Sequence, residues 1–278
     1  MISGEFDEYS AAHLERLKYI LADIYSGLGR ISDDLYLVGG LVADLLVKNK
    51  LGYLKEYLGT LDIDLALKFA VRGKSKFSGF YKKLREIGFE KQKTADGSEV
   101  MSHSFIKYEG GYKPVVLDLL IDDKFKPKAD KLKEIAPGVE AVKFRGVCLV
   151  FKDFLVRQIK RRGKNPLEIK IPNIIPFLTL KLFAYADREN RLAKDAFDIW
   201  YVIVNYKEGP DSVRKELIKY KDNSDVKEAF KVIPALFKEE TSEGVRDVVN
   251  ILAQRYGLDI SFARREVFTP FQKLDLEK

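Results

Sequence analysis

Two aspartates separated by one residue are the feature of this sequence best suited to chemistry. They lie between Leu61 and Leu67, where apolar residues alternate with the acids. In a β-strand, side chains two residues apart share a face, so Asp62 and Asp64 would project together while their neighbours enter the core. Carboxylates this close repel one another unless a cation compensates them, and a divalent metal ion is the simplest such cation. The pair predicts a metal site, although Asp-x-Asp pairs also occur as solvated turn residues.

A third acid lies inside another apolar run. Asp118 is surrounded by apolar residues from Val115 to Ile121. A charge in the middle of such a strand is unfavourable unless it is compensated, and a shared metal ion would compensate it. We therefore expect Asp118 to be the third ligand. An acid at a strand end that faces water is the alternative, and Asp122 or Asp123 could take its place.

A pair of glycines stands between an apolar run and a helical pattern. Gly39 and Gly40 follow the run Leu35 to Val38 and precede Leu41, where apolar residues recur at helical spacing. Glycines at a strand-to-helix junction let the backbone approach a ligand closely, and the N–H groups that open the helix suit a phosphate. A plain tight turn would explain the same pair.

The C-terminal half contains a lysine in apolar surroundings and two later acids. Lys181 stands among leucines and Phe183, and Asp195 and Asp198 follow Lys194. An ammonium group in such surroundings is unfavourable unless it meets an anion. An ion pair that joins two helices, from Lys181 to Asp195 or Asp198, is one explanation.

These motifs, taken in order, resemble a known group. Gly39-Gly40, the Asp-x-Asp pair and a later strand aspartate look like the nucleotidyltransferase superfamily built on the polymerase-beta-type core. The segments 178–188 and 191–200 are similar to the lysine motif and the Lys-Asp-x-x-Asp motif of the AbiEii-like nucleotidyltransferases. That family includes toxins of toxin–antitoxin pairs and of phage-defence systems. The resemblance covers roughly residues 33 to 205.

The chain departs from the family pattern in two places. The spacer from Gly40 to Asp62 is longer than is usual in the superfamily, and Asn49 to Gly59 has the character of an insertion. Family members often carry an arginine and a hydroxyl residue just before the first aspartate. Thr60 fits the hydroxyl position, but Leu58 stands where the arginine would be. If that arginine binds phosphate, another basic residue must serve here.

The resemblance implies a magnesium-dependent enzyme that transfers NMP from an NTP to an acceptor hydroxyl. Asp62 and Asp64 would hold two Mg²⁺ ions, and Asp118 would bind the catalytic ion and help to deprotonate the acceptor. The triphosphate would lie against backbone and hydroxyl groups and one basic side chain, which are those of Gly39, Gly40, Thr60 and Lys181.

The resemblance also implies a role for the second acidic motif and a class of partner. Asp195 would position Lys181 or the acceptor, and we prefer it to Asp198 because it directly follows a basic residue. RNA, in particular the 3′ end of tRNA, is the expected acceptor, and an antitoxin protein is a possible partner. Transfer to a small molecule such as an aminoglycoside, transfer to a protein, and a catalytically silent fold paired with a partner are the alternatives.

Composition excludes several other kinds of enzyme. The 278 residues include two histidines and one cysteine, so a structural zinc site or a Cys-His dyad is close to excluded. No Gly-x-Ser-x-Gly motif is present, which argues against a serine hydrolase. No apolar run is long enough to span a bilayer, and the acidic N-terminus does not resemble a secretory signal. We therefore expect a cytoplasmic protein whose carboxylates carry the catalysis.

Positive charge is concentrated in one stretch. The chain has 49 basic and 42 acidic residues, a net charge of +7. Arg157, Lys160, Arg161 and Lys164 recur at three- and four-residue steps, which predicts one face of a helix over residues 151–162. Beside the metal site, such a face would hold an RNA backbone through phosphate contacts, although an ordinary solvated surface is equally consistent.

The sequence as a whole predicts an α+β fold in two lobes. Residues 1–165 would form a nucleotidyltransferase-type mixed β-sheet lobe with flanking helices. Residues 166–278 would form a mainly helical lobe that contributes the Lys181 and Asp195 motifs. Strands are expected at 35–38, 62–69, 89–93, 102–108, 114–122 and 141–150, and helices at 11–27, 41–48, 75–87, 151–162, 177–187, 191–205 and 212–220, with later helices to about residue 256.

Overall fold

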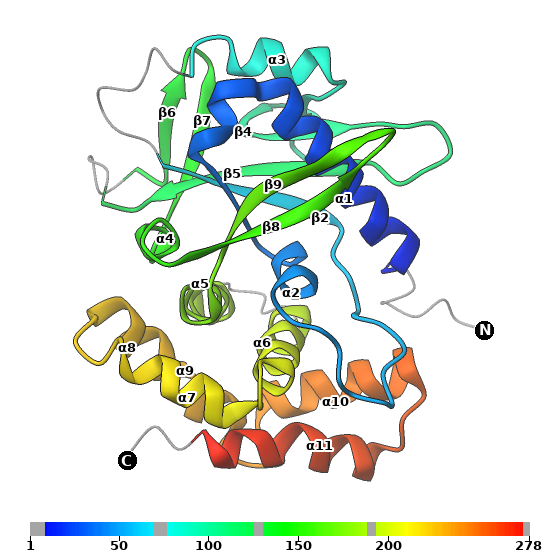
Figure 1. Cartoon of the computed structure of the whole chain (residues 1–278), viewed down its shortest axis with the longest axis vertical. Coiled ribbons are helices and arrows are strands. Elements are labelled where there is room, and N and C mark those ends of the chain that lie inside the picture. Colours follow the sequence, from blue (N-terminus) through cyan, green and yellow to red (C-terminus); the bar gives the residue numbers. More distant parts are fainter. Residues whose placement is uncertain (1–8, 69–76, 125–129, 188–192, 275–278) are drawn as a thin grey trace. The chain divides into compact units, whose positions relative to one another are not determined.

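The computed structural model describes residues 9–68, 77–124, 130–187 and 193–274. The fold is α+β, as predicted, and the chain divides into two compact units (Figure 1). We call residues 12–41 and 59–172 the sheet unit, and residues 1–11, 42–58 and 173–278 the helical unit. The chain thus leaves the sheet unit after residue 41 and returns to it at residue 59.

This division differs from the predicted lobes in two respects. The predicted boundary after residue 165 falls inside a strand, and the observed one follows Pro172. The segment 42–58, which includes most of the predicted insertion, belongs to the helical unit. Its attachment is specific, because the backbone N–H of Lys50 donates to Oδ1 of Asn205 at 2.6 Å, and Leu54 and Leu58 are buried.

The sheet unit is built around a mixed, seven-stranded sheet. Its two central strands, β2 and β5, run parallel, and β1 pairs antiparallel with β2. On the far side of β5, β4 and β3 follow antiparallel, while β7 pairs in parallel with the later residues of β5 and carries β6. The strands are β1 (Leu35–Val38), β2 (Asp62–Leu67), β3 (Glu90–Lys93), β4 (Val100–Lys107), β5 (Val115–Asp122), β6 (Leu132–Ala136) and β7 (Val139–Phe144).

The alternation of apolar and acidic residues in the sequence corresponds to the two faces of the central strands β2 and β5. Ile63 and Leu65 of β2 are fully buried, as are Leu117 and Leu119 of β5. The intervening acids are only partly buried. Apolar side chains at every second position therefore direct one face of the sheet into the core and leave the acids on the other.

Helices of the sheet unit cover its apolar face. The helix α1 (Ala11–Leu28) buries Leu14, Leu17, Ile20 and Leu21 along one side, as its spacing predicts. The hydroxyl of Tyr25 donates to the carbonyl of Leu35 at 3.2 Å and so ties α1 to β1. A short 3₁₀ helix (Gly29–Asp34), α3 (Phe80–Glu86) and α4 (Val147–Val150) complete this part; the first residues of the helix predicted at 75–87 lie outside the described residues.

The predicted basic helix at 151–162 is wrong. The chain forms instead an antiparallel hairpin of β8 (Phe154–Arg161) and β9 (Lys164–Pro172), in which Arg161 pairs with Lys164 across a turn whose Gly163 has φ +62°. β-Branched residues such as Ile159 and Ile169 favour strands, and glycine supplies the positive φ that the turn needs. The regular spacing of the basic residues was coincidental.

The hairpin also separates the basic side chains that the helix would have gathered. Arg157 and Arg161 are partly buried, whereas Lys160 and Lys164 are exposed and stand on different strands. These four residues therefore do not form one continuous basic face.

The helical unit holds the remaining elements. The long helix α5 begins at Ile174, directly after β9 and before the predicted start at residue 177. No helix within the described residues is both long enough and apolar enough to cross a membrane. The helices are α2 (Leu41–Leu46), α5 (Ile174–Asp187), α6 (Ala193–Asn205), α7 (Pro210–Ile218), α8 (Ser224–Phe230), α9 (Val232–Phe237), α10 (Glu243–Tyr256) and α11 (Ile260–Lys273).

Candidate functional site

The register of the central strands brings the three predicted aspartates to one face of the sheet. Asp64 of β2 pairs directly with Asp118 of β5, and Asp62 lies two residues earlier on β2, opposite Val116. Paired residues of adjacent strands share a face, as do residues two apart on one strand. Asp122, the alternative to Asp118, lies four residues further along β5, about 13 Å away at the usual rise per residue, and is therefore the weaker candidate.

Gly39 lies against the carboxylate of Asp64. The residue before it, Val38, pairs with Asp64, and Gly39 itself has φ +74°. A Cβ atom at this position would lie 1.8 Å from Oδ2 of Asp64, far inside van der Waals contact. Both the backbone conformation and the available space therefore require glycine.

This close approach leads to a prediction about Gly39. We expect Gly39→Ala to lower the free energy of unfolding by about 1–3 kcal/mol more than Gly97→Ala does, because the added methyl group must displace the Asp64 carboxylate. Gly97 is a matched control: its φ is also +74°, but nothing lies within 4 Å of a Cβ there. Urea unfolding of the two variants measures the difference. Equal losses would show that Asp64 moves aside freely.

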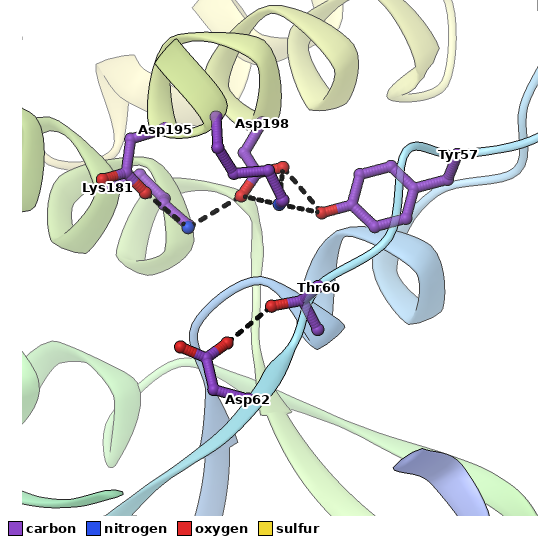
Figure 2. A network of polar contacts seen from close by, with 7 residues as sticks. Tyr57, Thr60, Asp62, Lys181, Asp195 and Asp198 are labelled. Atoms are coloured by element: carbon purple, nitrogen blue, oxygen red, sulfur yellow. Dashed lines mark hydrogen bonds and ion pairs between the residues drawn. The ribbon is translucent and has the colours of Figure 1, made fainter. Parts of the chain in front are cut away.

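The hydroxyl of Thr60 holds Asp62. Its Oγ1 donates to Oδ1 of Asp62 at 2.6 Å, and Thr60 is itself buried (Figure 2). The hydroxyl residue expected before the first aspartate is thus present and orients that carboxylate. A role for Thr60 in binding a triphosphate stays a prediction.

Basic groups that the sequence did not single out surround the same end of β2. His13 of α1 interacts with the backbone of Leu61, directly before Asp62. Burial lowers the pKa of His13; the charges of Arg16 and Lys113 lower it further, and that of Asp62 raises it. These side chains therefore lie near one another. Arg16 could have indicated this group from the sequence, because it is a charged residue on the apolar side of α1, four residues before Ile20.

Asp118 lies in surroundings that disfavour its ionised form. Burial raises the pKa of its carboxyl, and the charge of Asp62 raises it further. A hydrogen bond with Ser104 of β4 and the charge of His103 act in the opposite direction but do not outweigh these effects. The ionised carboxylate is therefore not fully compensated by the protein, as is expected of a group that binds a cation or accepts a proton.

The raised pKa predicts how stability depends on pH. Below the pKa that a carboxyl has in the unfolded chain, about 4, the group is protonated in both states and does not affect stability. If its pKa is higher in the folded state, stability falls as pH rises from the unfolded pKa through the folded one. We therefore expect Asp118→Asn to be more stable than the wild type at pH 7 and equally stable at pH 3, as measured by thermal unfolding. The exposed Asp33→Asn should show no difference at either pH. A less stable Asp118→Asn at pH 7 would contradict the assigned environment.

The chemistry of the three carboxylates fits a hard divalent cation such as Mg²⁺. Their oxygens come from two adjacent strands, and burial and the charge of Asp62 raise the pKa of Asp118. Across the described ranges of the chain, however, no three His, Cys, Asp or Glu side chains are already gathered closely enough to hold an ion.

In the helical unit, Lys181 bridges two acids. Its Nζ lies 2.8 Å from Oδ1 of Asp195 and 2.7 Å from Oδ2 of Asp198, which joins α5 to α6 (Figure 2). The ion pair considered from the sequence is thus present, and it involves both acids. Asp198 is fully buried and Asp195 is 3% exposed. Geometry therefore does not single out Asp195 as the partner of Lys181.

Two further residues complete this buried cluster: Lys194, which stands beside the two acids in the sequence, and Tyr57, which the sequence did not single out. Nζ of Lys194 lies 2.6 and 2.8 Å from the two oxygens of Asp198 and 2.8 Å from the hydroxyl of Tyr57. The Tyr57 hydroxyl donates to Oδ1 of Asp198 at 2.6 Å. Tyr57 belongs to the inserted segment, so the cluster fastens that segment to α6.

The cluster balances its own charges. Burial alone would lower the pKa of Lys181, but Asp195 and Asp198 outweigh burial and raise it, so Lys181 is charged. Burial and the charge of Lys181 lower the pKa of Lys194 in spite of Asp198. Burial, reinforced by Asp198, raises the pKa of Tyr57, which keeps its hydroxyl a donor. The cluster is thus a structural network in the chain as it stands.

No model of a known protein family matches this chain. A comparison with curated proteins gives no match either.

Proposed function

We propose that this protein is a magnesium-dependent nucleotidyltransferase that transfers NMP from an NTP to an acceptor hydroxyl. The observation that carries the proposal is the strand register: Asp64 stands beside Asp118, with Asp62 on the same face of β2. The contact between Gly39 and Asp64 supports it, because it places a glycine turn directly against one of these carboxylates. The glycine turn and the three aspartates are also the motifs in which the chain resembles the polymerase-beta-type pattern.

The three carboxylates would have distinct tasks. Mg²⁺ held by Asp62, Asp64 and Asp118 would stabilise negative charge on the attacking and leaving oxygens. The raised pKa of Asp118 suits its carboxylate to accept a proton. As the acceptor oxygen bonds to the α-phosphorus and pyrophosphate departs, the proton of the acceptor hydroxyl passes to Asp118. Thr60 keeps Asp62 in place during this step.

Backbone groups of the glycine turn would bind the triphosphate. Gly39 and Gly40 precede the first turn of α2, where N–H groups suit phosphate oxygens. Lys181 and Asp195 enter the proposal through the resemblance to the AbiEii-like family, in which such residues serve the nucleotide or the acceptor. Lys181 already has two carboxylate partners, so contact with a phosphate would have to compete with them.

RNA is the proposed acceptor, with the 3′ end of tRNA first among RNAs, and the protein would act as the toxin of a toxin–antitoxin or phage-defence pair. The family resemblance supports this choice, and an antitoxin is the corresponding protein partner. A small-molecule or protein acceptor is the second candidate, and a silent fold is the third.

The experiment that tests the proposal uses the purified chain with Mg²⁺, each α-labelled NTP in turn and total tRNA, followed by a denaturing gel. We expect label on RNA with one of the nucleotides, and none when EDTA replaces Mg²⁺. Labelled protein or small molecule instead would correct the acceptor. No transfer to any acceptor, together with no magnesium-dependent NTP binding by calorimetry, would refute the proposed activity.

A further inference from the structure

Two exposed tyrosines flank the loop between β4 and β5. Tyr108 is 73% exposed and Tyr112 is 68% exposed, more than any other large hydrophobic side chain among the described residues. Between them, Gly110 and Gly111 form a turn in which the N–H of Tyr112 donates to the carbonyl of Glu109 at 3.1 Å. Two aromatic rings exposed on both sides of one tight turn offer apolar surface to a partner.

The loop is held firmly in spite of its exposure. Arg16 of α1 is only 8% exposed; its Nε donates to Oε2 of Glu109 at 3.0 Å and its Nη1 to the carbonyl of Lys113 at 2.7 Å. The Cζ atom of Arg16 also lies 5.0 Å from the centre of the Tyr112 ring, within the range of a cation–π contact. One buried side chain thus fixes both sides of the turn, so a ligand meets Tyr112 on a prepared surface.

Positive charge predominates around the two rings. Lys107 ends β4 with its Nζ 3.3 Å from Oε1 of Glu109, and Lys113 is exposed beside Tyr112. Together with Arg16, these residues bring three positive charges to the loop; Glu109 and, near Arg16 and Lys113, Asp62 are the negative ones. Aromatic rings interleaved with cations are the arrangement by which proteins bind single-stranded nucleic acid: bases stack on the rings while cations accompany the phosphates.

The loop lies at the end of the sheet that carries Asp62. β5 begins at Val115, and the next residue, Val116, pairs with Asp62. Tyr112 precedes Val116 by four residues, so the two are about 13 Å apart at most, at the usual rise per strand residue. A strand of nucleic acid stacked on the loop therefore has its end within reach of the aspartate face.

We propose that Tyr108 and Tyr112 form a stacking platform for the unpaired 3′ end of an acceptor RNA. Lys113 and Lys107 supply positive charge for its backbone, and Arg16 holds the loop in place. This inference rests on the proposed nucleotidyl transfer for its direction, but it concerns binding alone. It also supplies a surface for RNA in place of the basic helix over residues 151–162, which the structure does not contain.

The test is binding of a 5′-fluorescein-labelled single-stranded RNA of about eight nucleotides, within the site sizes known for single strands, followed by fluorescence anisotropy. EDTA is present and NTP is omitted, so catalysis plays no part. We expect Tyr112→Ala and Tyr108→Ala each to weaken binding about 5- to 100-fold, the range for loss of one stacked base. Tyr112→Phe should bind like the wild type, since the ring remains.

Two controls make the result specific. Val100→Ala removes an exposed apolar side chain, 58% exposed, from the opposite end of β4, and should not change the affinity. Lys113→Ala should lower the slope of log affinity against log salt by about one, as loss of one phosphate contact does. Wild-type affinity in both tyrosine-to-alanine variants, or no binding of single-stranded RNA by the wild type, would overturn the platform. Neither result would test nucleotidyl transfer to another acceptor. Conversely, a failure of nucleotidyl transfer would not alter a loss of RNA affinity measured in the tyrosine variants.

Discussion

Replacing Asp198 with alanine should lower the free energy of unfolding of the helical unit by about 3–5 kcal/mol, the range for breaking a buried ion pair on one side. Asp198 is fully buried and accepts hydrogen bonds from Lys181, Lys194 and Tyr57. Without Asp198, Lys194 keeps its hydrogen bond to the Tyr57 hydroxyl. The buried ammonium groups of Lys181 and Lys194 then face the single negative charge of Asp195.

The chain contains its own probe for this measurement. Trp200 is the only tryptophan, it is fully buried, and it lies two residues after Asp198 in α6. Its fluorescence during urea unfolding therefore reports on the helical unit. Asp222→Ala, at an exposed position between α7 and α8, is the control and should stay within about 0.5 kcal/mol of the wild type. A loss below about 1 kcal/mol for Asp198→Ala would mean that the cluster rearranges around the gap.

The same cluster shows what could be predicted from the sequence. Lys181 was recognisable because a charge in an apolar helix needs an anion, and Asp195 and Asp198, three residues apart in the next helical segment, were candidates for it. Tyr57 was not recognisable, because it precedes Asp198 by 141 residues and reaches it only through the fold. Local spacing thus identifies the two helices that meet, but not the segment that a tertiary contact brings to them.

In the sheet unit, periodicity identified the strands and failed at the hairpin. β2 and β5 were predictable because burial on one face imposes a strict alternation on residues such as Ile63 and Leu117. In β8 the basic residues happen to recur at helical spacing, and this masked the strand preference of Val156 and Ile159. The pairing of Asp64 with Asp118 could not be derived from either strand alone, since register depends on both.

The pairing of Asp64 with Asp118 can be tested through the activity of an Asp64 variant. Asp64→Asn should lower nucleotidyl transfer at least about 1,000-fold, since loss of a metal ligand removes several kcal/mol of transition-state stabilisation. The amide keeps the shape of the side chain, and Asp64 lies on the partly exposed face of β2, so the fold should remain intact. The rate of transfer from labelled NTP measures the loss of activity, and thermal unfolding shows whether the fold is intact.

A second readout separates loss of the metal from loss of the fold. In the wild type, Mg²⁺ should raise the unfolding temperature, because an ion that binds the folded state stabilises it and relieves repulsion among Asp62, Asp64 and Asp118. Asp64→Asn should lose most of this increase, whereas Asp33→Asn, an exposed acid of the same unit, should retain it. If Asp64→Asn transferred nucleotide at the wild-type rate, the aspartate face would not be the catalytic centre. If it lost transfer but kept the full magnesium effect, Asp64 would act on the substrate, and the ion would be bound by the other carboxylates.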